Sequence, residues 1–315
     1  MERNYSSVAA MAGLLIVSQA VALLMASPFI SANMQVFEDP ESVATPIWYF
    51  GLLILVTIVI LFMIRIRKRN VLKHVILVAF GLTLLMVFDV LFLLISDALG
   101  LDAAIAIWAS FISAIAVATV LTILLYKYPE WYIVDFVGVC VAAAVAAILG
   151  ISLSILPVFI LLIILAVYDA ISVYKTKHMI TLADAVTQER LPVLLVVPTS
   201  KGYSFLKQKS LKEQIKKKEK RDAVFMGLGD IAIPGVLIVS AFSYLGSDGA
   251  VFSSSNILVA LGTLIGCLVG FLVLMRFVMK GNPQAGLPLL NGGAIAGYLI
   301  SYLIFYSNFT FGISI

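Results

Sequence analysis

The chain has 315 residues, of which 62% are hydrophobic and only 12% are charged, and its formal net charge is +4. A soluble domain carries about twice this fraction of charged residues, so the composition excludes an ordinary globular protein. Apolar runs such as 8–30 and 75–95 are long enough to cross a hydrocarbon core of about 30 Å, which needs about 20 helical residues. The runs are continuous rather than alternating, which favours helices over barrel strands.

The sequence predicts an all-α, polytopic membrane protein with nine transmembrane helices. We do not interpret the first span as a signal peptide. The region before it is short and contains Glu2 as well as Arg3, and its apolar stretch is longer than the hydrophobic region of a typical signal peptide. Gly150 and Pro157 mark the cut between the fifth and sixth spans. The expected spans are 8–30, 47–66, 72–95, 103–126, 132–149, 154–174, 224–245, 256–279 and 285–306.

The distribution of charge tests this count and orients the chain in a cell membrane. When the segments between spans are numbered alternately, all 21 Lys and Arg residues fall on one side. The positive-inside rule makes that side cytoplasmic, with the N-terminus inside and the C-terminus outside. The opposite side holds acidic residues without any Lys or Arg, namely Glu38, Asp39, Glu41, Asp97, Asp102 and Asp248.

One long polar segment divides the chain into three parts. We expect a six-helix part at 1–174, a basic cytoplasmic loop at 175–223 and a three-helix part at 224–315. We interpret the loop as a solvated segment whose lysines face water and anionic lipid headgroups. Its lysine run is not accompanied by a basic domain, so nucleic acid is not expected as a partner.

Three acidic residues lie well inside spans, where a carboxylate is costly and therefore a candidate functional group. Asp169 lies six residues before Lys175, which places it roughly 9 Å from the cytoplasmic edge. Asp230 lies nine residues after Arg221, roughly 13 Å from the same edge. Asp89 is deeper, at roughly 24 Å. Matched depth on two consecutive, oppositely directed spans predicts that Asp169 and Asp230 form a dyad.

A carboxylate dyad in a low-dielectric site supports aspartic-protease chemistry. Two carboxylates held close together share one proton, so one can activate a water while the other polarises the scissile carbonyl. This mechanism needs neither a cofactor nor a metal. The chain has no His-Glu-x-x-His zinc motif, and Cys140 and Cys267 lie inside apolar runs, so neither a disulfide framework nor a zinc site is expected.

Glycines and prolines accompany the candidate site in two places. Gly227-Leu228-Gly229 precedes Asp230, and Pro234 follows it; the glycines permit close approach of another backbone, and the proline removes a helical donor. The last expected span begins with Ala285-Gly286-Leu287-Pro288. Main-chain groups left free by the proline and glycine there could pair with an unwound substrate strand.

Two motifs resemble the signatures of presenilins and signal peptide peptidases. Tyr168-Asp169 is similar to the family's YD motif, and Gly227-Leu228-Gly229-Asp230 is similar to its GxGD motif. Together with the nine spans and the polar loop, they make the whole chain similar to the archaeal presenilin homologues. The resemblance implies an intramembrane aspartyl protease with the two aspartates as its catalytic pair. It also implies that Tyr168 shapes the site and that the two glycines keep the channel open.

The family's third motif, Pro-Ala-Leu, is not intact here. Matching the proline that follows the motif aligns it with Ala285-Gly286-Leu287, with Pro288 in register, whereas matching its own proline gives Pro288-Leu289-Leu290. We prefer the first alignment. The resemblance further implies transmembrane proteins or peptides as substrates within the lipid bilayer, and it leaves a homo-oligomer open.

Two alternative functions remain open on the residues alone. Prepilin-type peptidases also use a GxGD motif, but fewer spans and a different setting for the first aspartate would be expected. A secondary transporter could use intramembrane aspartates as proton or cation sites, but such folds often contain internal repeats, and we find no convincing repeat in this chain.

Overall fold

The computed structural model describes residues 2–65, 69–176, 192–200, 202–207, 222–245, 253–279 and 284–313. These residues form nine α-helices and one two-stranded sheet. Seven of the helices are long and apolar enough to cross a membrane, and two shorter apolar stretches lie at Ala44–Ile60 and Leu228–Tyr244. The expected all-α membrane protein with nine helices is therefore confirmed, with a small sheet in addition.

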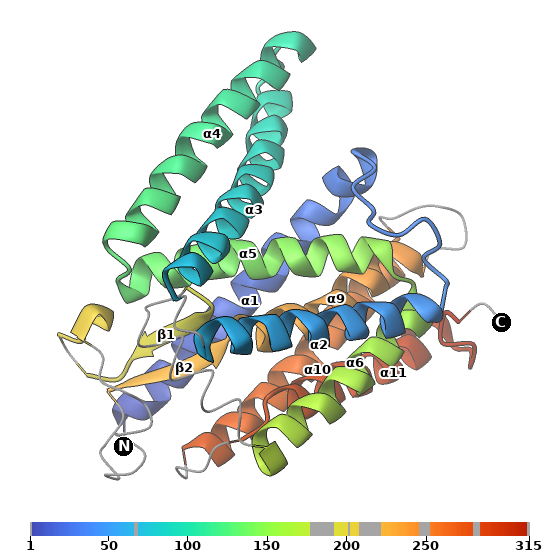
Figure 1. Ribbon diagram of the computed structural model, residues 1–315. Coiled ribbons are helices and arrows are strands. Elements are labelled where there is room, and N and C mark those ends of the chain that lie inside the picture. Colours follow the sequence, from blue (N-terminus) through green and yellow to red (C-terminus); the bar gives the residue numbers. More distant parts are fainter. Residues whose placement is uncertain are drawn as a thin grey trace. The chain divides into compact units, whose positions relative to one another are not determined.

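The helices follow the expected spans closely, with most ends displaced by a few residues (Figure 1). The chain divides into two compact units, and α1, α2 and α5 contribute residues to both. In chain order the elements are α1 (Glu2–Ser31), α2 (Ala44–Arg65), α3 (Arg69–Ala98), α4 (Ala103–Lys127), α5 (Trp131–Ser152), α6 (Ile155–Ile171), β1 (Leu194–Pro198), β2 (Ala223–Gly227), α9 (Leu228–Tyr244), α10 (Ser254–Val278) and α11 (Leu287–Tyr306).

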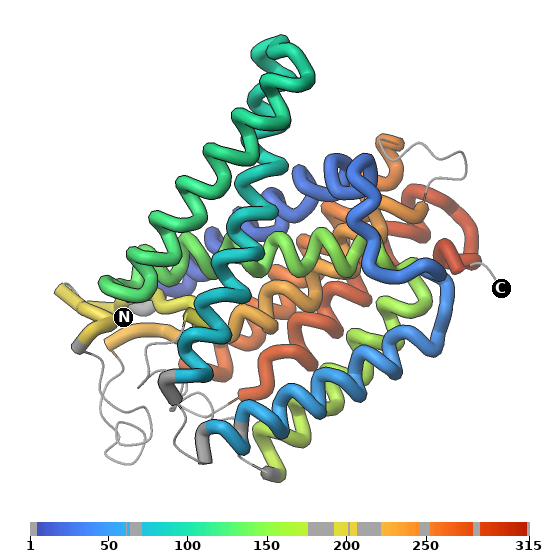
Figure 2. The backbone as a smooth tube through the Cα atoms, turned by 45° about the horizontal axis from the view of Figure 1, so that its top comes forward, coloured from blue at the N-terminus to red at the C-terminus, as the bar shows by residue number. Residues whose placement is uncertain are grey.

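The first unit comprises Met1–Leu14, Ile58–Ala144 and Thr181–Leu228. Its helices α3 and α4 lie side by side (Figures 1 and 2). Asp102 begins α4 as a cap, because its carboxylate accepts a hydrogen bond of 3.0 Å from the Ala104 N–H group. Capping satisfies one of the amides that every helix start leaves unpaired.

The sheet of this unit is an antiparallel pair in which Val196 lies opposite Phe225. The Val196 N–H group points away from β2 and donates to Asp135 Oδ1 at the start of α5, over 2.7 Å. Beyond β1, Glu130 accepts hydrogen bonds from the Ser204 hydroxyl (2.7 Å) and the Phe205 N–H group (3.0 Å). Two acids near the start of α5 therefore anchor β1 and the segment that follows it.

Two expectations for this region are wrong. The helix expected at 224–245 begins only at Leu228, because the preceding residues form β2. Part of the expected solvated loop is also buried: Leu195 and Val196 are fully enclosed in β1. The physical reason is a short run of leucines and valines between prolines at 192 and 198, which is a strand pattern. The lysine-rich residues 208–221 lie outside the described part.

The second unit comprises Leu15–Thr57, Val145–Ile180 and Gly229–Ile315. It holds α6, which continues through a π-helical turn at Ser172–Thr176, and it holds α10 and α11 as a closely packed pair. A Cβ on Gly266 would lie 2.2 Å from the Gly293 carbonyl oxygen, and a Cβ on Gly297 would lie 2.5 Å from that of Gly262. The absence of side chains thus lets the two helix backbones touch, as is typical of membrane helices.

We predict that Gly293→Ala destabilises the protein whereas Gly292→Ala does not. A Cβ on Gly293 would lie 2.3 Å from the Gly266 carbonyl oxygen, so the helices would have to separate; overpacking of this kind costs roughly 1–3 kcal/mol. Gly292 is exposed and has nothing within 4 Å of a built Cβ. Thermal unfolding in detergent measures both effects, and equal melting temperatures for the two variants would contradict the packing described.

Candidate active site

Asp169 lies on the buried face of α6, and its side chain is only 6% exposed. Leu161, Leu162 and Leu165 on the same helix are buried as well. Their distances of eight, seven and four residues from Asp169 place all four side chains on one stripe of the helix. α6 packs against α11, so the same apolar face that folds the helix brings the carboxylate into the protein.

Asp230 lies in the first turn of α9 and is half-buried. The following residues Ile231 and Ala232 are buried, whereas the preceding Gly229 is exposed. Pro234 lies inside the helix four residues after the aspartate, and it has no N–H group to donate to the Asp230 carbonyl. The helix is therefore weakened in the turn that carries the carboxylate.

The two carboxylates come together at the start of α11. The Leu287 N–H group donates to Asp169 Oδ2 over 3.1 Å, and the backbone of Gly286 lies beside the same carboxylate. Gly286 also contacts Asp230, because a Cβ on this glycine would lie 2.9 Å from Asp230 Cγ. The second unit thus brings the carboxylates from α6 and α9 against one dipeptide, Gly286-Leu287.

The remaining residues of the expected site occupy different surroundings. The Tyr168 ring packs edge-on against Phe50 of α2, with 5.7 Å between the ring centroids. Ala285 is buried directly before the dipeptide, and Pro288 follows it in the first turn of α11. Gly227 ends β2 and Leu228 begins α9, and both belong to the first unit. All the other residues of the expected site belong to the second unit.

Two further contacts hold the start of α11, and the sequence analysis did not assign them a role. Tyr174, in the π-helical turn after α6, donates from its hydroxyl to Gln284 Oε1 over 2.8 Å. Asn291 is buried, and its Nδ2 group donates to the Leu162 carbonyl oxygen of α6 over 2.9 Å. The sequence could have indicated the contact of Asn291, because an amide side chain inside an otherwise apolar span often hydrogen-bonds to a neighbouring membrane helix.

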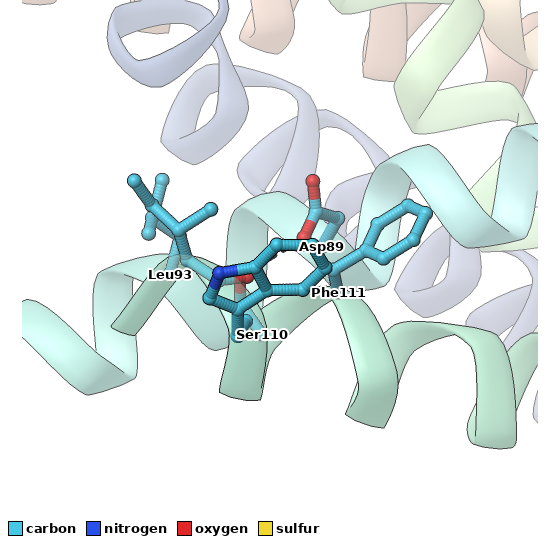
Figure 3. Close-up of a pocket in the computed structure, with 6 residues that line it drawn as sticks. Asp89, Leu93, Ser110 and Phe111 are labelled. Atoms are coloured by element: carbon cyan, nitrogen blue, oxygen red, sulfur yellow. Dashed lines mark hydrogen bonds between the residues drawn. The ribbon is translucent and has the colours of Figure 1, made fainter. Parts of the chain in front are cut away.

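Asp89, the third intramembrane acid, has a separate environment in the first unit. It lies on α3 and accepts a hydrogen bond of 3.0 Å from the Ser110 hydroxyl of α4. Both residues line a pocket of about 300 Å³, together with Leu93, Trp108 and Phe111. Figure 3 shows Asp89 and Ser110 beside Leu93 and Phe111. Asp89 therefore has a hydrogen-bonding partner of its own, on the neighbouring helix α4.

Within the described residues, no group of three or more His, Cys, Asp or Glu side chains could hold a metal ion. Cys140 and Cys267 are both buried and unpaired. The groups that the site offers are two carboxylates and the main-chain donor of Leu287. Such a set can bind a water molecule, transfer protons and polarise a carbonyl group.

A carboxylate pair inside a polytopic helical protein is the arrangement expected of an intramembrane aspartyl protease. This chain belongs to the family described as signal-peptide peptidase, presenilin aspartyl protease, whose model matches residues 12–307. The family membership confirms the resemblance noted in the sequence and decides against the prepilin-type peptidase and the transporter.

Two solved structures of presenilin family intramembrane aspartate proteases are similar to this chain. The structure in space group C222 is 37% identical, with a TM-score of 0.67, and the match covers 94% of this chain and 99% of that one. The structure in space group P2 is 39% identical, with a TM-score of 0.63, and the match covers 94% and 97%. A search of curated proteins gives no match.

We predict a graded loss of activity along the series Gly286→Ala and Gly286→Val. The φ angle of −78° is ordinary for any residue, so the effect of a side chain is steric. A single methyl group meets the Asp230 carboxylate at 2.9 Å, but that carboxylate ends a side chain that can rotate, so kcat should fall only a few-fold. The branched valine leaves no room, and displacement by about 1 Å can lower kcat about 100-fold.

Peptide cleavage in liposomes measures this series, and the melting temperature of each variant reports folding separately. Equal kcat values for the glycine, alanine and valine proteins would contradict the contact between Gly286 and Asp230.

Proposed function

We propose that Asp169 and Asp230 are the catalytic pair of this protease and that its substrates are transmembrane segments of other proteins. The observation that carries the proposal is the contact of both carboxylates with the dipeptide Gly286-Leu287. Carboxylates from two helices are costly inside a membrane, and their convergence at one backbone segment is difficult to explain by packing alone.

The chemistry follows from one proton shared between the two carboxylates. The ionised carboxylate takes a proton from a water molecule, whose oxygen attacks the scissile carbonyl carbon, while the protonated carboxylate gives its proton to the carbonyl oxygen. The tetrahedral diol then breaks its C–N bond as one carboxyl group donates a proton to the leaving nitrogen and the other carboxylate accepts a proton from a hydroxyl of the diol. The pair returns to one proton, and a single water molecule has been consumed.

The segment Ala285-Gly286-Leu287-Pro288 is proposed to shape the substrate site together with Tyr168, Gly227, Leu228 and Gly229. Leu287 donates to Asp169. An ionised carboxylate can accept several hydrogen bonds, so this contact leaves acceptor sites on Asp169 for a water molecule. The contacts of Leu287 with Asp169 and of Gly286 with Asp230 support the alignment of Ala285-Gly286-Leu287 with the family's Pro-Ala-Leu motif.

The charge distribution supports a cytoplasmic N-terminus and an external C-terminus, with the 175–223 loop in the cytoplasm. With this orientation the aspartates lie near the cytoplasmic side of the bilayer. The substrates are then transmembrane proteins or peptides that reach the site through the bilayer, and a homo-oligomer is compatible with the proposal.

We predict that Asp169→Asn and Asp230→Asn each lower cleavage at least about 100-fold, since general acid–base groups contribute about 10²–10⁴-fold. Purified protein in liposomes should be incubated with single-span peptides, and the products identified by mass spectrometry. Asp89→Asn is the matched control, because it also removes an intramembrane carboxylate, and it should keep most of the activity. Substantial turnover by either of the first two variants would refute the catalytic pair.

We predict that a cysteine placed at Ser210 is labelled from the cytoplasmic side and one placed at Asn308 from the outside. Both native cysteines are buried, so a membrane-impermeant maleimide reports the introduced residue. Sealed vesicles of known orientation, labelled before and after permeabilisation, distinguish the two sides. If both positions are labelled from one side, the proposed orientation is wrong.

A further inference from the structure

A buried side-chain amide from α1 contacts the helix that carries Asp230. Gln19 belongs to the same unit as both aspartates and is fully buried. Its Nε2 group donates to the main-chain carbonyl oxygen of Ile231 over 2.8 Å. Ile231 directly follows Asp230 in the chain, so the hydrogen bond from Gln19 is made to the turn that presents the carboxylate.

α9 makes room for this amide by means of a glycine. A Cβ on Gly235 would lie 2.2 Å from Gln19 Oε1 and 2.9 Å from its Cδ atom, so any other residue at 235 would force the amide to move. The direction of the amide is defined by chemistry, because the Ile231 carbonyl oxygen can only accept and must face the Nε2 donor. Gln19 is therefore fitted into a notch in α9 with one defined orientation.

The position of this notch gives the contact its significance. Pro234 cannot donate to the Asp230 carbonyl, and its ring crowds the turn before it, so this part of α9 lacks one hydrogen bond of a regular helix. Gln19 supplies a donor to the same turn from a neighbouring helix. A hydrogen bond of this kind has few competitors in a membrane interior, where water is excluded.

We propose that Gln19 is a positioning residue for catalysis, which holds the first turn of α9 so that the Asp230 carboxylate keeps its place against Gly286. Gln19 does not touch the reacting atoms and acts through the backbone of Ile231. The proposal rests on the catalytic role proposed for Asp230. It adds that full activity also requires the hydrogen bond from Gln19 to the Ile231 carbonyl oxygen.

The test compares Gln19→Met with Asn256→Leu. Methionine keeps the length of Gln19 but cannot donate. Asn256 serves as the control, because it too is a buried amide and its Nδ2 group donates to a carbonyl oxygen of α9, that of Phe242, over 3.2 Å, while its Oδ1 atom also accepts from the Tyr306 hydroxyl. Phe242 lies twelve residues after Asp230, roughly 18 Å along the helix. Both variants should lower the melting temperature, but only Gln19→Met should lower kcat, by about tenfold or more with little change in KM.

Gln19→Glu provides a second variant that retains the shape of the side chain. Its protonated carboxyl group can donate to the Ile231 carbonyl oxygen, whereas the ionised form can only accept. The ratio of its kcat to that of the wild type, measured at each pH, should therefore be near one at low pH and should fall as pH rises. The wild-type protein has the same aspartate pair, so taking the ratio removes the pH dependence of Asp169 and Asp230. This matters because Asp230 directly precedes Ile231, to which the side chain at position 19 binds.

The outcomes separate the two proposals. If Asp230→Asn remains active, the proposed catalytic pair fails. If Asp230→Asn is inactive but Gln19→Met keeps wild-type kcat, or loses activity only as Asn256→Leu does at a similar melting temperature, the role of Gln19 is refuted. If Gln19→Met does not fold, the Gln19→Glu ratio decides, and a ratio that is independent of pH overturns the inference.

Discussion

The hydrogen bond from the Leu287 N–H group to the Asp169 carboxylate satisfies two groups that a membrane interior would otherwise leave unpaired. The first amides of a helix have no partner within that helix, and α11 begins at Leu287. A carboxylate removed from water likewise needs donors. The aspartate of α6 therefore caps α11 from a neighbouring helix. The carboxylate gains a donor and the helix amide gains an acceptor, so neither group is buried without a partner. A helix that began one turn earlier would bury these amides in its own hydrogen bonds and leave Asp169 without them.

This arrangement depends on residues that have almost no side chain. Gly286 lets the Asp230 carboxylate approach the same backbone that binds Asp169. Gly266 and Gly293 bring α10 and α11 into backbone contact, while Asn291 fastens α11 to Leu162 of α6. Close packing between helices is the main attractive interaction available in lipid, because the hydrophobic effect does not distinguish a helix neighbour from an acyl chain. The start of α11 is thus held from two sides by contacts that do not involve the aspartates.

The sequence was sufficient to predict the spans and that Asp169 and Asp230 lie close together, because both depend on the membrane as solvent. Apolar length and charge placement are imposed by the bilayer, and a carboxylate such as Asp169 at depth is conspicuous for the same reason. The strand β1 was missed because it is short and lies in a mostly polar segment, where a few valines do not alter the average composition. The contacts of Gln19 and Asn291 could not be predicted, since which carbonyl an amide binds depends on how the helices pack.

The change from strand to helix at Leu228 explains why the number of residues in Gly227-Leu228-Gly229-Asp230 matters for the direction of the Asp230 side chain. The Leu228 N–H group donates to the Val193 carbonyl oxygen and so extends the pairing of β1 with β2, although Leu228 is also the first residue of α9. Asp230 follows two residues later, still within the first helical turn. Each residue rotates a helix by roughly 100°, so one inserted residue would turn the carboxylate to another face of α9. The strand sets where the helix begins, and the count from Leu228 then determines the direction in which Asp230 points.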